Sequence, residues 1–150
     1  MTRSRRLLCL FYGLIAALAL LGTGSQNRHY FASPAGTLNA FGAFVVDAKV
    51  TPASRSIAVD IAIVFLAAIV FMLFEARKLR IPFVWAYIVL GLLVAISVTF
   101  PLFLVAREFK LAALKDGGAV PPPAEPTLLD LLGLVAMTAL ALGLCWFTLA

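Results

Sequence analysis

Residues 57–74 read IAVDIAIVFLAAIVFMLF, and the residues that follow, 75–80, read EARKLR. The first run is long enough to cross the hydrocarbon core of a bilayer as a helix, and its only charged residue is Asp60. The second run is a basic turn, which is typical of the cytoplasmic end of a membrane span. We therefore predict a membrane-spanning helix at about 57–74.

The composition of the whole chain agrees with lipid as its solvent. Of its 150 residues, 63% are hydrophobic and 13% are charged, and the mean hydropathy is +1.07. Soluble domains carry about 45–50% apolar and about 25% charged residues. The length suits a single domain, residues 1–150. The formal charge is +5, but the basic residues stand at the ends of apolar runs, so we expect no nucleic-acid partner.

Three other apolar runs are predicted to span the membrane, at about 7–22, 83–105 and 127–149. The first follows a basic tail, as a signal peptide does, but its length and the absence of a cleavage pattern favour a retained helix. A short turn joins the spans at 57–74 and 83–105, which predicts an antiparallel hairpin. Pro101 is expected to bend the third span near its far end or to free a carbonyl there.

Two stretches between the spans are predicted to lie outside the hydrocarbon. Residues 38–46 are apolar and include Phe41 and Phe44, but they are too few to span, so we expect an interfacial segment in the first outer loop. Thr51 and Pro52 then predict the start of a helix. The glycines and prolines of 115–126 predict an exposed loop.

The placement of lysine and arginine predicts the orientation. Six basic residues are concentrated in the amino-terminal tail and the turn after residue 74: Arg3, Arg5, Arg6, Arg77, Lys78 and Arg80. The other six are spread over two longer loops: Arg28, Lys49, Arg55, Arg107, Lys110 and Lys115. The two counts are equal, but the residues of the first set are concentrated close to the ends of the spans. We therefore assign that side of the bundle to the cytoplasm. We predict an all-α, four-helix integral membrane bundle with both termini cytoplasmic.

A set of short motifs in the middle of the chain resembles a known family. The motifs are Pro52-Ala-Ser54, Asp60, Phe71-Met-Leu-Phe-Glu75-Ala-Arg-Lys78, Trp85-Ala-Tyr87, Phe100-Pro-Leu-Phe-Leu104 and Arg107-Glu108. They resemble a bacterial family of small integral membrane proteins that is defined only as a domain of unknown function, over about residues 7–110. The resemblance implies three core helices and a bacterial inner membrane. It implies no activity, and the fourth span would be an extension of the family.

Asp60 is the most informative polar residue, because an acid at mid-bilayer costs roughly 2.5–3.5 kcal/mol on insertion scales. We expect it to face protein or a water-filled cavity. It would act as a catalytic acid, a proton site or a cation ligand, or it would form a structural pair with Arg107 or Arg55.

Other charged residues are predicted to gather at the two membrane faces. On the outer face, Arg107, Glu108 and Asp130 would join Asp60 around a lipid-binding pocket, or they would form the ordinary charged rim of a bundle. Asp47 would contribute to the same cluster.

A structural role is predicted for four further residues: Glu75, Arg77, Lys78 and Pro101. The first three belong to the inner end of the second span, where they set topology. Glu75 lies about 22 Å along the helix from Asp60, so the two cannot form a carboxylate dyad.

The sequence contains no metal-ligand, nucleotide or nucleophile motif, so no metal or cofactor is expected. Whether the protein is an enzyme stays open. Our first hypothesis is a structural or interaction subunit that packs with itself or with another membrane protein, among membrane lipids. The alternatives are an isoprenoid or other lipid cyclase or isomerase with Asp60 as the acid, and a small transporter subunit.

Overall fold

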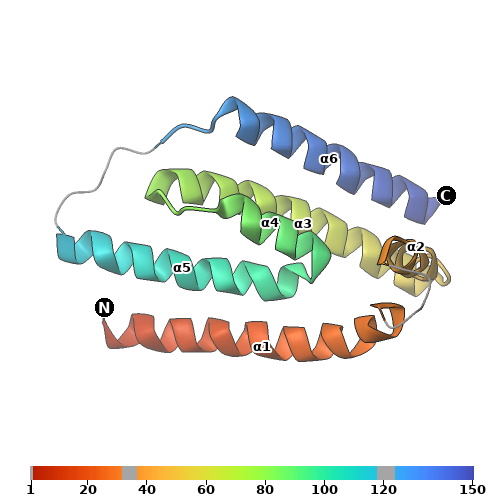
Figure 1. Cartoon of the computed structure of the whole chain (residues 1–150), viewed down its shortest axis with the longest axis horizontal. Coiled ribbons are helices and arrows are strands. Elements are labelled where there is room, and N and C mark those ends of the chain that lie inside the picture. The colour runs from red at the N-terminus through yellow and green to blue at the C-terminus, as the bar shows by residue number, and fades with distance from the viewer. Residues whose placement is uncertain (1, 32–36, 118–123) are drawn as a thin grey trace.

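The computed structural model describes residues 2–31, 37–117 and 124–150. These residues form helices and contain no strand, which confirms the all-α prediction. The helices are α1 (Arg3–Phe31), α2 (Thr37–Asp47), α3 (Pro52–Leu79), α4 (Val84–Leu93), α5 (Ile96–Gly117) and α6 (Leu128–Leu149), as Figure 1 shows.

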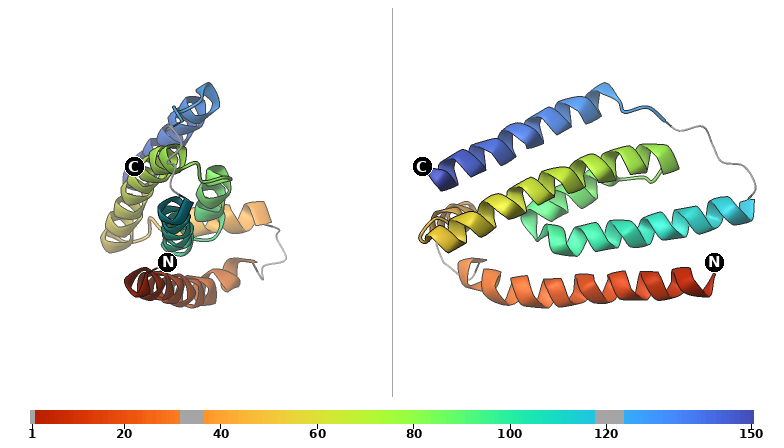
Figure 2. Two further views of the ribbon diagram at one scale, coloured as in Figure 1. Left: turned by 90° about the vertical axis from the view of Figure 1, so that its left-hand side faces the viewer. Right: turned by 180° about the vertical axis from the view of Figure 1, so that it is seen from behind.

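The four long helices lie side by side (Figures 1 and 2). α1 packs along α5, and α3 packs against both α5 and α6. α2 lies across one end of the bundle in contact with α1, and we call this the α2 end. Lys49 donates a hydrogen bond to the carbonyl of Phe147 at 3.2 Å, so α6 also finishes there. We call the opposite end, with Arg3 and Leu79, the basic end.

Helix α3 begins where the sequence predicts. The hydroxyl of Thr51 accepts the backbone N–H of Ser54 at 3.0 Å, and the hydroxyl of Ser54 accepts the N–H of Thr51 at 3.0 Å. This reciprocal cap satisfies two donors that a helix start leaves unpaired, and Pro52 occupies the first turn. The helix ends at Arg80, whose left-handed backbone (φ 53°) stops it.

The predicted third span, 83–105, is not one helix. α4 ends at Leu93, the chain turns back, and α5 begins at Ile96 (Figure 1). With 10 residues, α4 is about 15 Å long, about half the thickness of a bilayer's hydrocarbon core. The prediction of a continuous span is therefore wrong. α4 and α5 form a hairpin that starts and finishes at the basic end, and its tip stops partway along the bundle.

Local sequence allows the chain to break there. Four β-branched residues, which have lower helix propensity, surround the turn: Val94, Ile96, Val98 and Thr99. Gly91 lets the two arms approach, because a Cβ at this position would lie 2.8 Å from the hydroxyl of Thr99. Pro101 is buried near the start of α5, inside the helix, rather than near the far end of a span.

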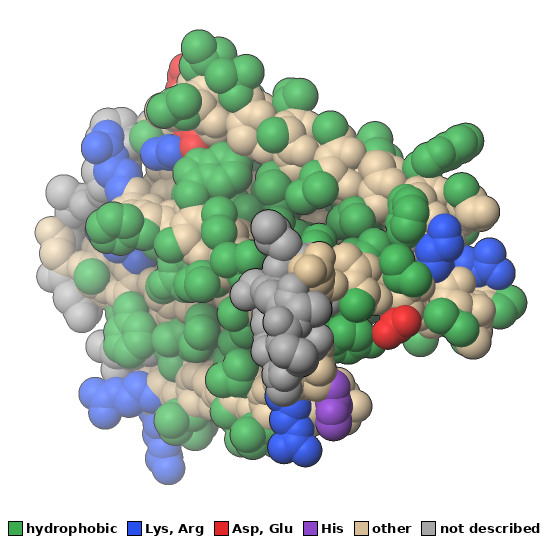
Figure 3. All heavy atoms as spheres, turned by 45° about the vertical axis from the view of Figure 1, so that its right-hand side comes forward, with side chains coloured by type: hydrophobic (Ala, Val, Ile, Leu, Met, Phe, Trp, Pro, Cys, Tyr) green, Lys and Arg blue, Asp and Glu red, His purple; other side chains and the backbone are tan. Residues whose placement is uncertain are grey.

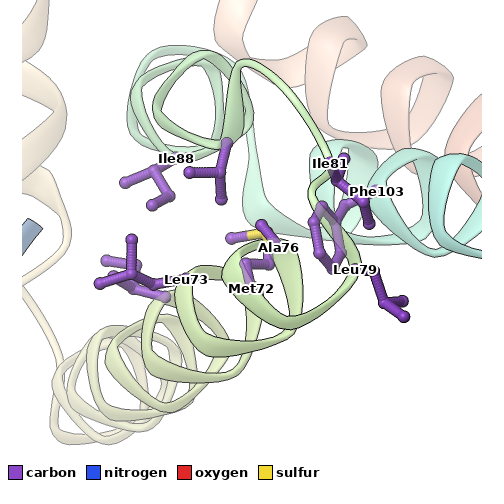
Figure 4. Close-up of a cluster of buried hydrophobic side chains, with 9 residues drawn as sticks. Met72, Leu73, Ala76, Leu79, Ile81, Ile88 and Phe103 are labelled. Carbon is purple, nitrogen blue, oxygen red and sulfur yellow. The ribbon is translucent and has the colours of Figure 1, made fainter. Parts of the chain in front are cut away.

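The most tightly packed part of the protein lies where α3, α4 and α5 meet (Figure 4). Met72, Ile88 and Phe103 have no exposed surface. The ring of Phe103 makes edge-to-face contacts with Phe71 and Tyr87, at centroid distances of 6.4 and 5.7 Å. This core fixes the hairpin against α3 and so sets how far the tip reaches toward the α2 end.

Most apolar side chains of the long helices remain on the surface. α1, α3 and α6 are long and apolar enough to cross a membrane, and they are the helices of the described residues that meet this criterion. Within the most apolar window of each, 6%, 28% and 11% of the residues are buried. Figure 3 shows apolar side chains over most of one face, with charged ones toward its ends. Such a surface is typical of helices that lie in a membrane.

The hairpin also changes where the chain ends lie. Because α4 and α5 start and finish at the basic end, the first and last helices point their free ends in opposite directions (Figure 1). A bundle of four full spans would have brought both termini to one face. This arrangement therefore departs from the predicted four spans with both termini on one side.

Candidate functional site

Two groups of polar residues at the basic end tie the helices together. In the first, Asp130 at the start of α6 has no exposed surface. Its carboxylate accepts hydrogen bonds from Arg77 on α3 at 2.5 Å and from the indole of Trp85 on α4 at 3.0 Å. Thr127 caps α6 and also donates to this carboxylate, from both its N–H and its hydroxyl, at 2.8 Å. One buried acid thus joins three helices.

Trp85 also limits what can stand opposite it on α6. A Cβ added at Gly133 would overlap the six-membered ring of Trp85. The glycine therefore lets the indole approach the α6 backbone closely while its N–H reaches Asp130.

The second group links α1, α3 and α5. Arg107 on α5 donates to Glu75 on α3 at 2.7 Å and to its neighbour Glu108 at 2.9 Å. Arg5 on α1 lies 3.4 Å from the other oxygen of Glu108. Glu75 and Glu108 are largely buried, and each has an arginine beside it. The pairing resembles a structural ion-pair network rather than an open reaction site.

The structure does not bring the predicted outer cluster together. Arg107, Glu108 and Asp130 lie at the basic end, whereas Asp60 lies about 22 Å along α3 from Glu75, toward the α2 end. Asp60 is exposed, and it has no hydrogen-bond or ion-pair partner among the described residues. Its expected pair with Arg107 is absent, because Arg107 bonds Glu75 instead. Its role remains a prediction.

A large cavity occupies the space that the short hairpin leaves free at the α2 end. Its volume is about 780 Å³, within the range of sites for small organic ligands. Its walls come from the last turns of α1, from α2, from the first half of α3 and from the second half of α6, and its floor is the hairpin tip. The lining is mainly apolar, and it includes exposed residues such as Ile61 and Leu93, so the cavity opens onto the apolar surface of the bundle.

Polar groups gather where α2 covers this cavity. The hydroxyl of Tyr30 donates to Asp47 at 2.9 Å, which joins the end of α1 to the end of α2. The Tyr30 ring also meets Phe44 edge-on, at a centroid distance of 5.5 Å. Asn27 lies one turn earlier on the same face of α1 and also lines the cavity. The site therefore has an apolar body and one polar end.

The sequence indicated part of this site. Phe41 and Phe44 were expected in an interfacial segment of the first outer loop, and both residues line the cavity. Asp47, which was expected near a lipid pocket, lines it too. Asn27 and Tyr30 were missed as site residues. The polar residues 25–30 directly after an apolar run were the available signal, because they continue α1 by nearly two turns.

Comparison with known families extends this picture. The family described as protein of unknown function DUF2834 matches residues 11–109. The chain belongs to this family. No curated protein and no solved structure matches the chain.

The DUF2834 region contains most of the cavity. It includes all but the first turns of α1, all of α2, α3 and α4, and the first part of α5. The α6 wall of the cavity lies beyond the match, as does Asp130, which pairs with Arg77 of the DUF2834 region. In this chain α6 therefore completes both the cavity and the buried ion pair.

Proposed function

We propose that this protein is a membrane-embedded binding protein that holds one amphipathic lipid in the cavity at the α2 end. The cavity of about 780 Å³ carries the proposal, because a full-length third span would have filled this space. Its apolar body suits a hydrocarbon chain, and its opening toward lipid gives such a chain a way in. The polar end under α2 provides hydrogen-bonding groups for a head group.

The orientation that accompanies this proposal has the basic end in the cytoplasm. The hairpin brings Arg107, Lys110 and Lys115 to the same end as the basic residues of α1 and of the α3–α4 turn. Nine of the 12 lysines and arginines then lie at one end, and the remaining three, Arg28, Lys49 and Arg55, lie at the other. The positive-inside rule supports a cytoplasmic Arg3 and an outward-facing Leu149, in a bacterial inner membrane.

Binding is better supported than acid catalysis. The cyclase or isomerase hypothesis assigned the proton to Asp60, yet Asp60 is not among the residues that line the cavity. The lining acid is Asp47, which already accepts a hydrogen bond from Tyr30. Association with a second copy or with another membrane protein is compatible with lipid binding and remains a prediction.

Filling the cavity should abolish binding. Ala58 and Ala62 line it from one face of α3, so the double variant Ala58→Phe/Ala62→Phe places two rings in the space of the hydrocarbon chain. We expect at least tenfold less 1-oleoylglycerol to remain bound in native mass spectrometry. Ala53 and Ala67 lie on the same helix outside the cavity, and Ala53→Phe/Ala67→Phe is the matched control. Equal retention by both double variants would rule out the proposal.

A further inference from the structure

We infer that the cavity selects lipids with an uncharged, hydrogen-bonding head group and rejects lipids with an anionic one. This inference rests on the proposed function and adds the chemical class of the ligand. Lipids with a hydroxyl, carbonyl or amide head would be accepted, and those ending in a phosphate or a carboxylate would be excluded. The observations are the charges that line the cavity and the groups at its polar end.

The first observation is the absence of a cation. None of the 12 lysines and arginines lines the cavity, and neither does His29. All of these cationic residues belong to the part of the chain that the structure describes. Lys49 of the α2 end is directed away from the cavity, since its ammonium group lies 4.1 Å above the ring of Phe147. A bound anion would therefore have no countercharge inside the cavity.

The second observation is the acid at the polar end. Asp47 lines the cavity, and among the described residues it is the only charged side chain that does so. Its carboxylate accepts a hydrogen bond from the neutral hydroxyl of Tyr30, at 2.9 Å. A lipid phosphate at this end would meet a like charge with no cation between them. Asp47 is exposed at this end of the cavity, so the cost comes from repulsion between two like charges rather than from full burial of the phosphate.

The third observation is a set of neutral hydrogen-bonding groups on adjacent turns. Thr23, Asn27 and Tyr30 follow one face of α1 at helical spacing, and all three line the cavity. The amide of Asn27 both donates and accepts hydrogen bonds, as a hydroxyl or carbonyl head requires. The half-buried Asn27 is therefore the group that we assign to the head of the lipid.

A matched pair of probes tests the inference on the full-length protein. 1-Oleoylglycerol and 1-oleoylglycerol 3-phosphate have the same chain and differ by one phosphate. In native mass-spectrometric titrations of the wild-type protein, we expect the uncharged lipid to bind at least tenfold more tightly. Asn27→Lys places a cation at the polar end and should lower this preference at least tenfold. Ser25→Lys adds the same charge two residues earlier in α1, on a face outside the cavity, and should leave the preference unchanged.

The outcomes separate the two proposals. If both lipids bind the wild type equally, and Ala58→Phe/Ala62→Phe abolishes both, the cavity binds lipid but the head-group inference fails. If 1-oleoylglycerol 3-phosphate binds more tightly than 1-oleoylglycerol, the head-group inference also fails. If the filled variant retains both lipids as the wild type does, the proposed function itself fails. The wild-type ratio decides the head-group question even if the lysine variant does not fold.

Discussion

Replacement of Asp130 by alanine should loosen α6 from the rest of the bundle. The carboxylate has no exposed surface and receives hydrogen bonds from Arg77, Trp85 and Thr127. Removing one partner of a buried ion pair costs about 3–5 kcal/mol, because the other charge is left behind. Arg77 is 31% exposed and can extend toward water, so we expect a loss near the lower limit, about 3 kcal/mol.

The free energy of unfolding in mixed detergent–SDS micelles measures this loss. Asp60→Ala removes the same group from an exposed position on α3 and is the matched control, with an expected change below about 0.5 kcal/mol. Because α6 forms one wall of the cavity, Asp130→Ala should also weaken retention of 1-oleoylglycerol. Equal stabilities of the two variants would mean that Asp130 does not hold α6 in place.

Replacement of Phe103 by alanine should destabilise the hairpin. Its ring is fully buried between α3 and α4, and it contacts both Phe71 and Tyr87. In soluble proteins this substitution costs about 3–5 kcal/mol. Helices that separate in lipid still bury their apolar surface in hydrocarbon, so only the packing contribution is lost. We therefore expect about 2–3 kcal/mol in the same unfolding assay.

Phe109 provides the control for this prediction. It lies on the same helix, but 58% of its surface is exposed, so Phe109→Ala should change the free energy of unfolding by less than about 0.5 kcal/mol. The hairpin tip forms the floor of the cavity, so Phe103→Ala should also reduce lipid retention. A stability indistinguishable from that of Phe109→Ala would show that the core at Phe103 does not fix the hairpin.

Local signals in the sequence were sufficient for several elements. Thr51 and Pro52 predicted the start of α3, because capping depends on side chains within a few residues. The apolar run at 127–149 predicted α6. The segment 38–46, too short to span, corresponds to α2. These elements can be predicted from local sequence, without knowing which helices pack against them.

The hairpin could not be predicted in the same way. The 23 uncharged, mainly apolar residues 83–105 are long enough for one span, and hydropathy alone does not show whether the chain turns back within them. The decision depends on tertiary contacts, such as Gly91 against Thr99 and Phe103 against α3. A Gly- and Pro-interrupted apolar segment was the available signal.

The error about the hairpin explains the error about the site. Treating 83–105 as a full span moved Arg107 and Glu108 to the outer face, where they were grouped with Asp60. It also assigned six lysines and arginines to each face of the membrane. With the hairpin, nine lysines and arginines lie at the basic end and three at the α2 end. The polar end of the cavity is formed by Asn27, Tyr30 and Asp47.

Cysteine accessibility tests the half-length hairpin, and with it the origin of the cavity, most directly. In a background of Cys9→Ser/Cys145→Ser, single cysteines would be placed by Pro82→Cys before α4, Gly117→Cys at the last residue of α5 and Ala150→Cys after α6. These changes leave all 12 lysines and arginines intact. With a membrane-impermeant maleimide on oriented vesicles, positions 82 and 117 should react from one side and position 150 from the other. Reaction of positions 82 and 117 from opposite sides would mean that residues 83–105 cross the membrane completely. That result would contradict both the hairpin and the cavity.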